Sequence, residues 1–214
     1  MTSTRLSDLL GSVAVPEGVR PSMIEPYERT DDYADLMRDV RRSRIRKAGL
    51  RGVYAEARCA EGDAAFERFK QGRGTYLWGL PGRGKTYAAA ACARLAVLHA
   101  YKTRFVTAKA LLDQVKAEYD GRERDALKRA ERYDLLVLDD LGMERPTEWA
   151  METISGLIDA RVAEGKPTVL TSNYALGELR ERWGGMEGAR LVSRIAGACE
   201  RVEVKGEDRR LACR

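Results

Sequence analysis

The 214-residue sequence has few of the residues that bind metals or form disulfides. It contains one histidine, His99, and four cysteines that are not arranged as C-x-x-C pairs: Cys59, Cys92, Cys199 and Cys213. A structural zinc site needs a cluster of such ligands, so this class of site is excluded. We interpret Cys92 as a small buried apolar residue, and this use of cysteine is typical of a protein in a reducing cytoplasm.

Long apolar runs and an amino-terminal targeting segment are also lacking. No apolar run approaches the ~20 residues that a membrane-spanning helix needs. Met1 to Leu10 carries Arg5 and Asp8 where a signal peptide would have its apolar stretch. We therefore expect a cytoplasmic protein with no membrane partner.

Charge and apolar residues are both abundant. Apolar residues make up 44% of the chain, enough for a core, and charged residues make up 33%. The length predicts one domain of ordinary size with room for a small appendage. The net charge of +5 is compatible with an acidic partner such as nucleic acid, but a charge spread over a whole surface does not identify one.

One glycine-rich segment fits the phosphate-binding pattern G-x-x-x-x-G-K-[ST]: Gly79, Leu80, Pro81, Gly82, Arg83, Gly84, Lys85 and Thr86. An apolar run precedes it and an alanine-rich run from Tyr87 follows, which is the strand, loop and helix context that this motif needs. The glycines let backbone N–H groups turn towards phosphate oxygens, and the helix dipole attracts the same anion. We expect Lys85 to reach the β- and γ-phosphates and Thr86 to hold Mg²⁺, with Tyr87 closing the nucleotide-binding segment. A glycine-rich turn that matches by chance is the alternative.

Short apolar runs alternate with helical patterns five times along the chain. We expect strands at Thr75 to Trp78, Thr103 to Thr107, Leu135 to Asp140, Thr168 to Ser172 and Arg201 to Val204. The expected helices are 56–70, 85–98, 108–119, 121–132, 147–163, 176–183 and 189–196, after an earlier helix that begins at Thr30 or Asp31. The run Leu135 to Leu138 is continuously apolar, which indicates burial on both faces and therefore a mainly parallel α/β sheet.

Two adjacent carboxylates, Asp139 and Asp140, end the third expected strand, where ligands bind in open α/β sheets. We expect Asp139 to hold Mg²⁺, often through water, and Asp140 to orient or deprotonate the attacking water. Neighbouring residues on an extended strand point in opposite directions, so the two acids cannot share one task. A cap on the following helix is the alternative for either acid.

Three further polar residues are candidates for the chemistry. Asn173 follows the fourth expected strand, where its amide can lie between the γ-phosphate and the attacking water, although Ser-Asn is also common in turns. Arg190 and Arg194 lie four residues apart on one helix face. Either can present a guanidinium to a nucleotide bound by a neighbouring subunit, and we favour Arg194. The alternative is that both are surface arginines.

Four segments together resemble AAA+ ATPases: 79–86, 135–142, 167–173 and 190–195. They most resemble helicase loaders of the DnaC/DnaI type and the related IstB transposition ATPases, over about residues 44–210. The resemblance implies a five-stranded parallel P-loop sheet in the order 5-1-4-3-2, with helices on both faces and no helical lid domain. It assigns Asp139 and Asp140 to Walker B, Asn173 to sensor 1 and Arg194 to the arginine finger.

The resemblance also implies cofactors and partners. Proteins of this kind bind and hydrolyse ATP with Mg²⁺, assemble into rings or spirals, contact single-stranded DNA and place a hexameric DnaB-like helicase on it. In this sequence Asp140 stands where AAA+ proteins commonly carry glutamate, which favours slow hydrolysis. We divide the chain into a short, partly helical arm at 1–43, with helicase docking as its implied role, and an ATPase domain at 44–214.

Three functions stay open at this point. They are a helicase loader, an IstB-like regulator of a transposase on duplex DNA, and a nucleotide-dependent interaction module with negligible turnover. For contact with DNA the candidates lie on or after the expected helix 108–119: Lys109, Lys116, Arg122 and Arg124. A solvated helix face is an equally good interpretation of this cluster. The same choice applies to the arginine-rich run between Arg38 and Arg51.

Overall fold

The protein is described by a computed structural model at residues 31–119, 125–142 and 147–208. The chain divides into two units, Met1–Val40 and Arg41–Arg214. The described part of the first unit is the beginning of helix α2 (Asp31–Lys47), which starts where the sequence predicts. Asp35 and Arg38 form an ion pair one turn apart on this helix. The domain boundary at 43/44 stays a prediction.

The second unit is an α/β structure. Its strands are β1 (Gly74–Trp78), β2 (Thr103–Thr107), β3 (Leu135–Leu141), β4 (Thr168–Ser172) and β5 (Cys199–Glu203). After α2, its helical elements are the 3₁₀ helix η3 (Gly52–Glu56) and the α-helices α3 (Ala60–Lys70), α4 (Lys85–Leu98), α5 (Ala108–Tyr119), α6 (Ala126–Arg132), α7 (Glu148–Ala163), α8 (Leu176–Trp183) and α9 (Gly185–Ala198). None of the helices in the described ranges is long and apolar enough to cross a membrane.

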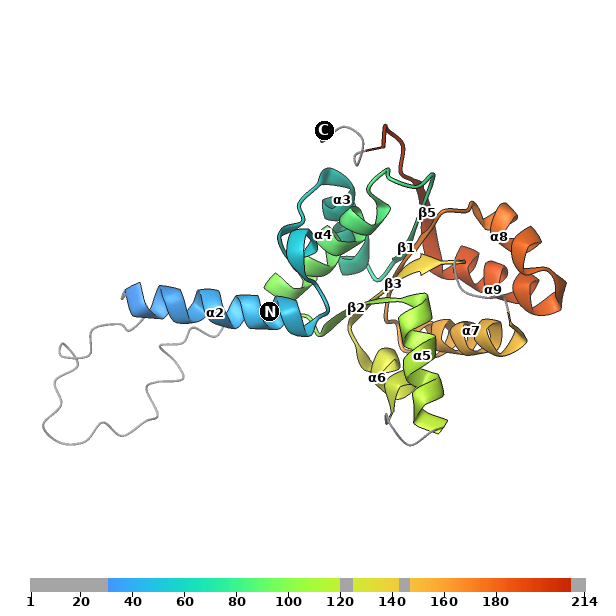
Figure 1. Cartoon of the computed structure of the whole chain (residues 1–214), viewed down its shortest axis with the longest axis horizontal. Helices are drawn as coiled ribbons and strands as arrows, with labels where there is room; N and C mark the ends of the chain where they lie inside the picture. Colours follow the sequence, from blue (N-terminus) through green and yellow to red (C-terminus); the bar gives the residue numbers. More distant parts are fainter. Residues whose placement is uncertain (1–30, 120–124, 143–146, 209–214) are drawn as a thin grey trace, which may run out of the picture. The chain divides into compact units, whose positions relative to one another are not determined.

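The five strands form one parallel sheet in the order β2-β3-β4-β1-β5, which confirms the expected order 5-1-4-3-2. Helices cover both faces of the sheet (Figure 1). The described residues after β5 are 204–208, so the expected absence of a lid domain stays a prediction.

A separate apolar core lies on each face of the sheet. Along β3, Leu136 and Leu138 pack into the core that contains residues of α5, α7, α8 and α9. Leu135 and Val137 pack into the opposite core, which contains residues of α3 and α4. All four side chains are fully buried, which confirms that a continuous apolar run belongs to a strand covered on both faces.

The sequence-based prediction was wrong over the expected helix 56–70. The 3₁₀ helix η3 ends at Glu56, and α3 begins only at Ala60. Cys59 is extended, with φ −164° and ψ 157°, and Glu61 and Asp63 lie in the first turn of α3, where acidic side chains are favourable. The interruption lets the backbone N–H of Arg58 donate a hydrogen bond to the Tyr87 hydroxyl on α4.

Other boundaries shift by a few residues. Helix α9 begins at Gly185, four residues before the expected start, and β5 spans Cys199–Glu203 instead of 201–204. Helix α6 begins at Ala126, and residues 121–124 of the expected helix 121–132 lie outside the described residues. Helix α7 begins at Glu148 because the Thr147 side chain caps it, accepting a hydrogen bond from the N–H of Ala150.

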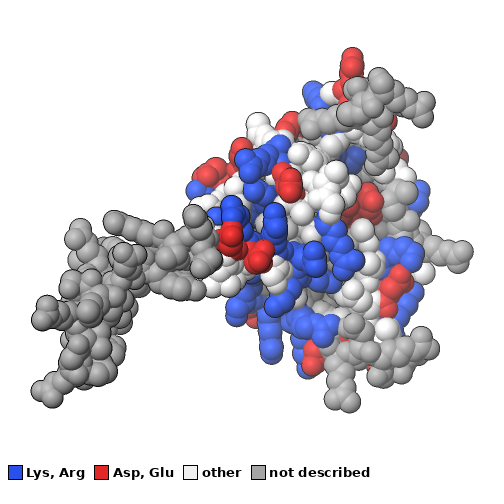
Figure 2. Space-filling view, turned by 60° about the vertical axis from the view of Figure 1, so that its left-hand side comes forward, with Lys and Arg blue, Asp and Glu red and all other residues white. Residues whose placement is uncertain are grey.

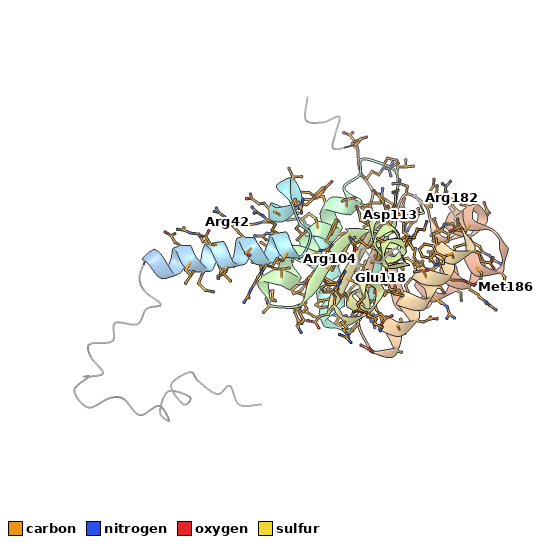
Figure 3. The ribbon with its side chains drawn as sticks, turned by 60° about the horizontal axis from the view of Figure 1, so that its bottom comes forward. Arg42, Arg104, Asp113, Glu118, Arg182 and Met186 are labelled. Carbon is orange, nitrogen blue, oxygen red and sulfur yellow. The ribbon has the colours of Figure 1, made fainter. Side chains whose placement is uncertain are left out.

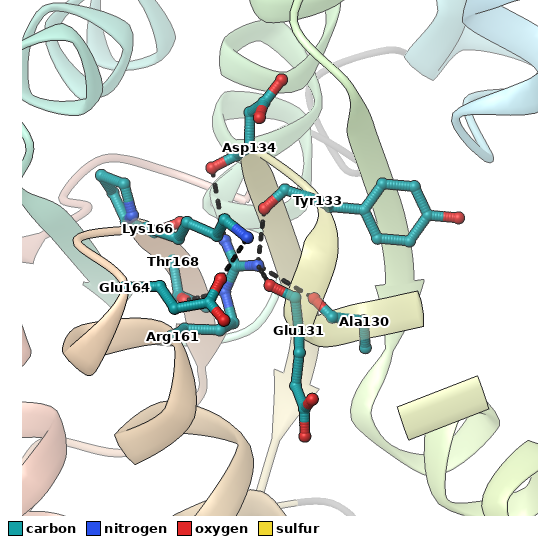
Figure 4. Close-up of polar contacts among 9 residues, drawn as sticks. Ala130, Glu131, Tyr133, Asp134, Arg161, Glu164, Lys166 and Thr168 are labelled. Carbon is teal, nitrogen blue, oxygen red and sulfur yellow. Dashed lines mark hydrogen bonds and ion pairs between the residues drawn. The ribbon is translucent and has the colours of Figure 1, made fainter. Parts of the chain in front are cut away.

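A buried arginine holds the amino ends of β3 and β4 together. Arg161 on α7 is 0% exposed, and its Nε donates to the Thr168 hydroxyl at 2.9 Å. Its other nitrogens donate to the carbonyl oxygens of Ala130, Glu131, Tyr133, Asp134 and Pro167 (Figure 4). The guanidinium therefore ties the end of α6 and the starts of two strands to α7.

Candidate nucleotide-binding site

The glycine-rich loop lies at the carboxyl end of β1 and leads directly into α4. Gly79, Gly82 and Gly84 have φ values of 144°, 79° and 92°. Side chains rarely tolerate this backbone region, so the three motif glycines are needed for the shape of the loop. Gly84 caps α4, and Lys85 is the first residue of the helix. The strand, loop and helix order that the sequence predicts is confirmed.

Lys85 places a buried positive charge within this loop. The residue is 5% exposed, and its Nζ donates hydrogen bonds to the carbonyl oxygens of Gly79 at 2.7 Å and Leu80 at 2.9 Å. The ammonium group therefore lies beside the first residues of the loop, at the amino end of α4. Both the charge and the helix dipole favour an anion here.

Asp139 brings a carboxylate to the same place from β3. The residue is 4% exposed and accepts a hydrogen bond at 2.6 Å from the Thr171 hydroxyl on β4. Burial raises the pKa of the Asp139 carboxyl, while hydrogen bonds from Thr171 and Thr86 and the charge of Lys85 act in the opposite direction. The fold thus unites Lys85, Thr86 and Asp139.

The donor set fits Mg²⁺ bound together with a nucleotide. Mg²⁺ prefers hard oxygen ligands and is commonly held by one or two protein oxygens plus substrate phosphates. Thr86 and Asp139 offer a hydroxyl and a carboxylate in hydrogen-bond contact. Within the described ranges, the structure has no group of three or more His, Cys, Asp or Glu residues that could hold a metal ion. Thr86 and Asp139 would therefore hold Mg²⁺ jointly with phosphate oxygens.

Asp140 has a different backbone from the one expected. It does not continue the extended strand, because its φ is 57° and the pairing of β3 with β4 is irregular between Leu138 and Leu141. Its N–H donates to the Thr171 hydroxyl at 2.9 Å, and its side chain is exposed. The two acids therefore face different surroundings because of a bulge and not through simple strand alternation. The role of Asp140 towards the attacking water stays a prediction.

Asn173 follows β4 at the same edge of the sheet. Ser172 donates from its hydroxyl to the Leu141 carbonyl at 2.7 Å and accepts from the Tyr174 N–H at 3.2 Å, which links the ends of β3 and β4 around Asn173. The Tyr76 hydroxyl on β1 donates to the Tyr174 carbonyl at 2.7 Å. The structure therefore places Asn173 on a well-anchored turn beside the strand that carries both acids, and its role as sensor 1 stays a prediction.

Arg182 was not predicted as part of this region. It lies on α8 (Figure 3). Its Nε donates to the Gly142 carbonyl at 2.8 Å, and its guanidinium lies 5.1 Å from the centre of the Tyr174 ring. It thus connects the residue after β3 with the turn after β4. In the sequence it stands in a charged helical run, where an exposed side chain is the ordinary interpretation.

Arg190 and Arg194 both lie on α9 but differ in their contacts. Arg194 is held against α7, because its Nε donates to the Ser155 hydroxyl at 2.9 Å and it pairs with Asp159 at 2.8 Å. Arg190 pairs with Glu187 on its own helix and has a 61% exposed side chain. Neither of these contacts involves the P-loop. The finger assignment, in which Arg194 acts on a neighbouring subunit, stays a prediction.

The segment after β5 lies along the P-loop, which the sequence did not reveal. The N–H of Val204 donates to the Trp78 carbonyl at 2.8 Å, just before the loop begins. A Cβ atom on Gly82 would lie 2.1 Å from the Asp208 carboxyl carbon. The Asp208 carboxylate therefore occupies the space beside Gly82 that a side chain would fill.

The fold and the site together define a class of protein. A P-loop follows β1, a buried acid ends β3, and the intervening strand β4 ends beside both, as in AAA+ P-loop proteins. Residues 56–214 match the family described as IstB-like ATP binding protein, and the chain belongs to this family. A crystal structure of DnaI has a TM-score of 0.61 with 26% sequence identity, over 67% of this chain and 83% of that one.

The curated relatives are of two kinds. The replicative helicase loader DnaI of Bacillus subtilis is 28% identical over 68% of this chain and 50% of the relative. The insertion sequence IS5376 putative ATP-binding protein of Geobacillus stearothermophilus is 30% identical over 62% of this chain and 53% of the relative. The chain thus spans about half the length of these relatives. Their names confirm an ATP-binding family and leave the choice between the two roles open.

Proposed function

We propose that the protein is an ATP-dependent switch that loads a replicative helicase onto single-stranded DNA. The observation that carries this proposal is the placement of the Lys85 charge and the Thr86 hydroxyl beside the buried Asp139 carboxylate, a donor set that suits phosphate and Mg²⁺ together. Thr86 and Asp139 hold Mg²⁺, which supplies charge neutralisation at the phosphates, and Lys85 binds the β- and γ-phosphates. Asp140 and Asn173 orient water, and Arg194 of a neighbouring copy completes the site.

Slow hydrolysis is part of the proposal. Asp140 has a short side chain on a strained backbone, which limits how far it reaches towards water. Arg194 already pairs with Asp159 and Ser155, so its use as a finger requires that α9 of one copy meets the nucleotide of another. Turnover therefore depends on self-association into a ring or spiral.

A basic surface supports contact with nucleic acid. Lysine and arginine side chains gather on the face that Figure 2 brings forward. Two hollows lie near the amino end of β2. In the part of the chain that the structure describes, their lining has no acidic residue and five basic ones: Arg44, Lys47, Lys102, Arg104 and Arg129. Tyr133 lines both hollows and Tyr101 lines one of them. Basic grooves with aromatic side chains suit single-stranded nucleic acid.

The cluster expected from the sequence is less suited to this role. Lys109 forms an ion pair with Asp113, and Lys116 lies 4.9 Å from the centre of the Trp149 ring. Arg122 and Arg124 lie outside the described residues. We therefore place the main DNA contact on the basic hollows at the amino end of β2.

A Lys85→Ala variant tests the nucleotide site. We expect it to lose ATP binding in a fluorescent-nucleotide titration, whereas Lys128→Ala, which changes an exposed lysine, retains it. An ATPase assay on the assembled protein then compares Arg194→Ala with Arg190→Ala. A true finger costs about 10³-fold or more in turnover. Unchanged ATP binding by Lys85→Ala would remove the central claim, and equal turnover of the two arginine variants would remove the finger.

DNA binding and the partner are tested separately. Changing Lys47, Arg104 and Arg129 to glutamine should weaken single-stranded DNA binding and lower its salt dependence, because fewer counterions are released. The same change at Lys109, Lys116 and Lys128 removes an equal number of positive charges and is the matched control. Co-purification with the replicative helicase encoded by the same genome supports the loader, whereas co-purification with a transposase supports the IstB-like regulator.

A further inference from the structure

Thr171 makes an unusual pair of hydrogen bonds. It is 0% exposed on β4, its hydroxyl donates to Asp139 Oδ1 at 2.6 Å, and the same oxygen accepts from the Asp140 N–H at 2.9 Å. A hydroxyl has one proton to donate and lone pairs to accept. One side chain on the central strand β4 therefore contacts both acids at the end of β3.

The first bond orients the Asp139 carboxylate. The terminal torsion of an aspartate is broad and roughly two-fold, so a free carboxylate does not hold a single direction. A short hydrogen bond to a charged oxygen is about twice as strong as a neutral one. With Oδ1 bound to Thr171, the plane of the carboxylate is set, and a definite oxygen geometry is available for a metal ion.

The second bond supports the strained backbone of Asp140. A φ of 57° is uncommon for a residue other than glycine, because a side chain disfavours this backbone region. This conformation separates the buried Asp139 from the exposed Asp140. The Thr171 hydroxyl satisfies the N–H that the irregular pairing of β3 with β4 removes from the regular ladder.

We propose that Thr171 is a positioning residue that couples the orientation of the metal-binding acid Asp139 to the backbone of the neighbouring Asp140. It touches neither the phosphates nor the attacking water in this assignment. The inference rests on the proposed ATP and Mg²⁺ site and deepens it. In this proposal the Thr171 hydroxyl orients the Asp139 carboxylate together with Thr86, and it supports the backbone conformation that leaves Asp140 exposed.

Three variants test this role. Thr171→Val keeps the shape and removes the hydroxyl, and Thr171→Ser keeps the hydroxyl. Thr75→Val is the matched control, because Thr75 is equally buried on β1 and its hydroxyl has no hydrogen-bond partner among the described residues. The primary measurement is the affinity for a fluorescent ATP analogue as Mg²⁺ is varied. Turnover and thermal unfolding are measured on the same samples.

For Thr171→Val we expect a higher Mg²⁺ requirement. The Mg²⁺ concentration that gives half of the maximal gain in affinity for the ATP analogue should rise about 10-fold to 100-fold, as for other residues that orient metal ligands. Nucleotide affinity without Mg²⁺ stays unchanged, and Thr171→Ser restores the Mg²⁺ response. An unchanged Mg²⁺ response in Thr171→Val would overturn the proposal, as would equal losses in Thr171→Val and Thr75→Val. Absent hydrolysis in the parent protein contradicts the proposed ATPase function alone, since the binding measurement does not need turnover.

The contact of the carboxyl-terminal segment with the P-loop supports a second, independent inference. A Cβ atom on Gly79 would lie 2.7 Å from the Val204 carbonyl oxygen, so this segment follows the loop closely from its first residue. At Gly82 the neighbouring group is the carboxylate of Asp208. A negative side chain thus lies directly against a loop built to bind negative phosphates.

We infer that Asp208 opposes ATP binding until the segment moves away from the loop. A triphosphate held by the loop and the Asp208 carboxylate both carry negative charge, and like charges at short range repel even near solvent. ATP binding is then linked to displacement of the residues that follow Val204, up to Asp208. The position of this carboxyl-terminal segment therefore differs between the ATP-free and the ATP-bound protein.

Asp208→Asn removes the charge and keeps the size. We expect about five-fold tighter ATP binding at low salt, from one like-charge contact near the surface, and a smaller gain at high salt. Glu207→Gln is the matched control, since it makes the same charge change at an exposed neighbouring residue. Equal effects of both variants, or weaker binding by Asp208→Asn, would overturn the inference. If the parent protein does not bind ATP at all, the nucleotide site itself is contradicted instead.

Discussion

The two ends of the sheet each bury a charged side chain, and they treat it differently. At the amino ends of β3 and β4, Arg161 donates to six oxygen atoms. At the carboxyl ends of the same strands, Asp139 accepts from the Thr171 and Thr86 hydroxyls, while the nearby Lys85 ammonium donates to two loop carbonyls. A buried charge with all its hydrogen bonds made within the chain serves the fold. A buried carboxylate whose oxygens have lone pairs left for further ligands suits the binding of a cation.

The pKa values shift towards the neutral form at both ends. Burial lowers the pKa of the Arg161 guanidinium to about 10, so it stays protonated at neutral pH. Burial also raises the pKa of the Asp139 carboxyl, with the Asp140 charge acting in the same direction. Both groups therefore cost free energy when charged, and only Arg161 recovers that cost through a complete set of internal hydrogen bonds.

Mutation of Arg161, at the amino ends of β3 and β4, should reduce the stability of the protein more than the other changes described below. Arg161→Leu leaves five carbonyl oxygens and the Thr168 hydroxyl without their donor, so we expect a loss of about 3–5 kcal/mol in the free energy of unfolding. Urea unfolding followed by circular dichroism measures it. Arg180→Leu, at an exposed arginine, is the control and should stay within about 0.5 kcal/mol of the parent. A change below about 1 kcal/mol in Arg161→Leu would mean that the arginine does not hold the strands.

Mutation of Asp139, at the carboxyl ends of β3 and β4, should reduce activity without reducing stability. For Asp139→Asn we expect turnover to fall by about 10²–10³-fold, because the proposed magnesium ligand is gone, while the free energy of unfolding is unchanged or higher. The folded pKa lies above the ordinary 3.8, so the native state binds more protons and stability falls as the pH rises from 3.8 through the raised pKa. The asparagine variant should lack this fall in urea titrations across that range. A clear destabilisation at neutral pH would contradict the comparison.

Removing one acceptor from Arg161 should have a smaller effect. Thr168→Val deletes the hydroxyl that accepts from Nε and keeps the other five bonds. We expect a loss of about 0.5–1.5 kcal/mol by urea unfolding, the ordinary value for one hydrogen bond. If Thr168→Val lowers the free energy of unfolding as much as Arg161→Leu does, the Thr168 hydroxyl and not the five carbonyl oxygens accounts for the effect of Arg161.

Thiol labelling gives the smallest and most local measurement. Burial raises the pKa of Cys92 and Cys199 to about 12, so neither should react with a thiol reagent at neutral pH, while the partly exposed Cys59 should. The Cys199 thiol contacts the carbonyl oxygen of Thr168 at 3.6 Å, and Arg161 binds the hydroxyl of the same threonine. Its labelling should increase in Arg161→Leu and stay slow in Asp139→Asn, with Cys213 changed to serine in every sample. Equal labelling in both variants would show that the two ends are not independent.

Much of the candidate site could be predicted because its signals are local. Gly79 to Thr86 forms one continuous motif, and the apolar run before Asp139 identifies a buried strand. The break between η3 and α3 was missed, because 56–70 has a helical composition and only the contact of Arg58 with Tyr87 shows why the chain opens there. The left-handed backbone of Asp140 was missed because an apolar strand pattern carries no sign of a bulge.

The sequence by itself determined that the protein has a P-loop, an acid at a strand end and an alternation of strands and helices. Each of these depends on neighbouring residues and on the periodicity of burial. Only the tertiary structure decided that Thr171 contacts both acids, that Arg161 joins two strand ends and that Asp208 lies on the loop. Thr171 and Asp139 are 32 residues apart in the chain, and Gly82 and Asp208 are farther apart still. Such contacts arise from strand order and packing, which bring together residues whose local sequences contain no trace of one another.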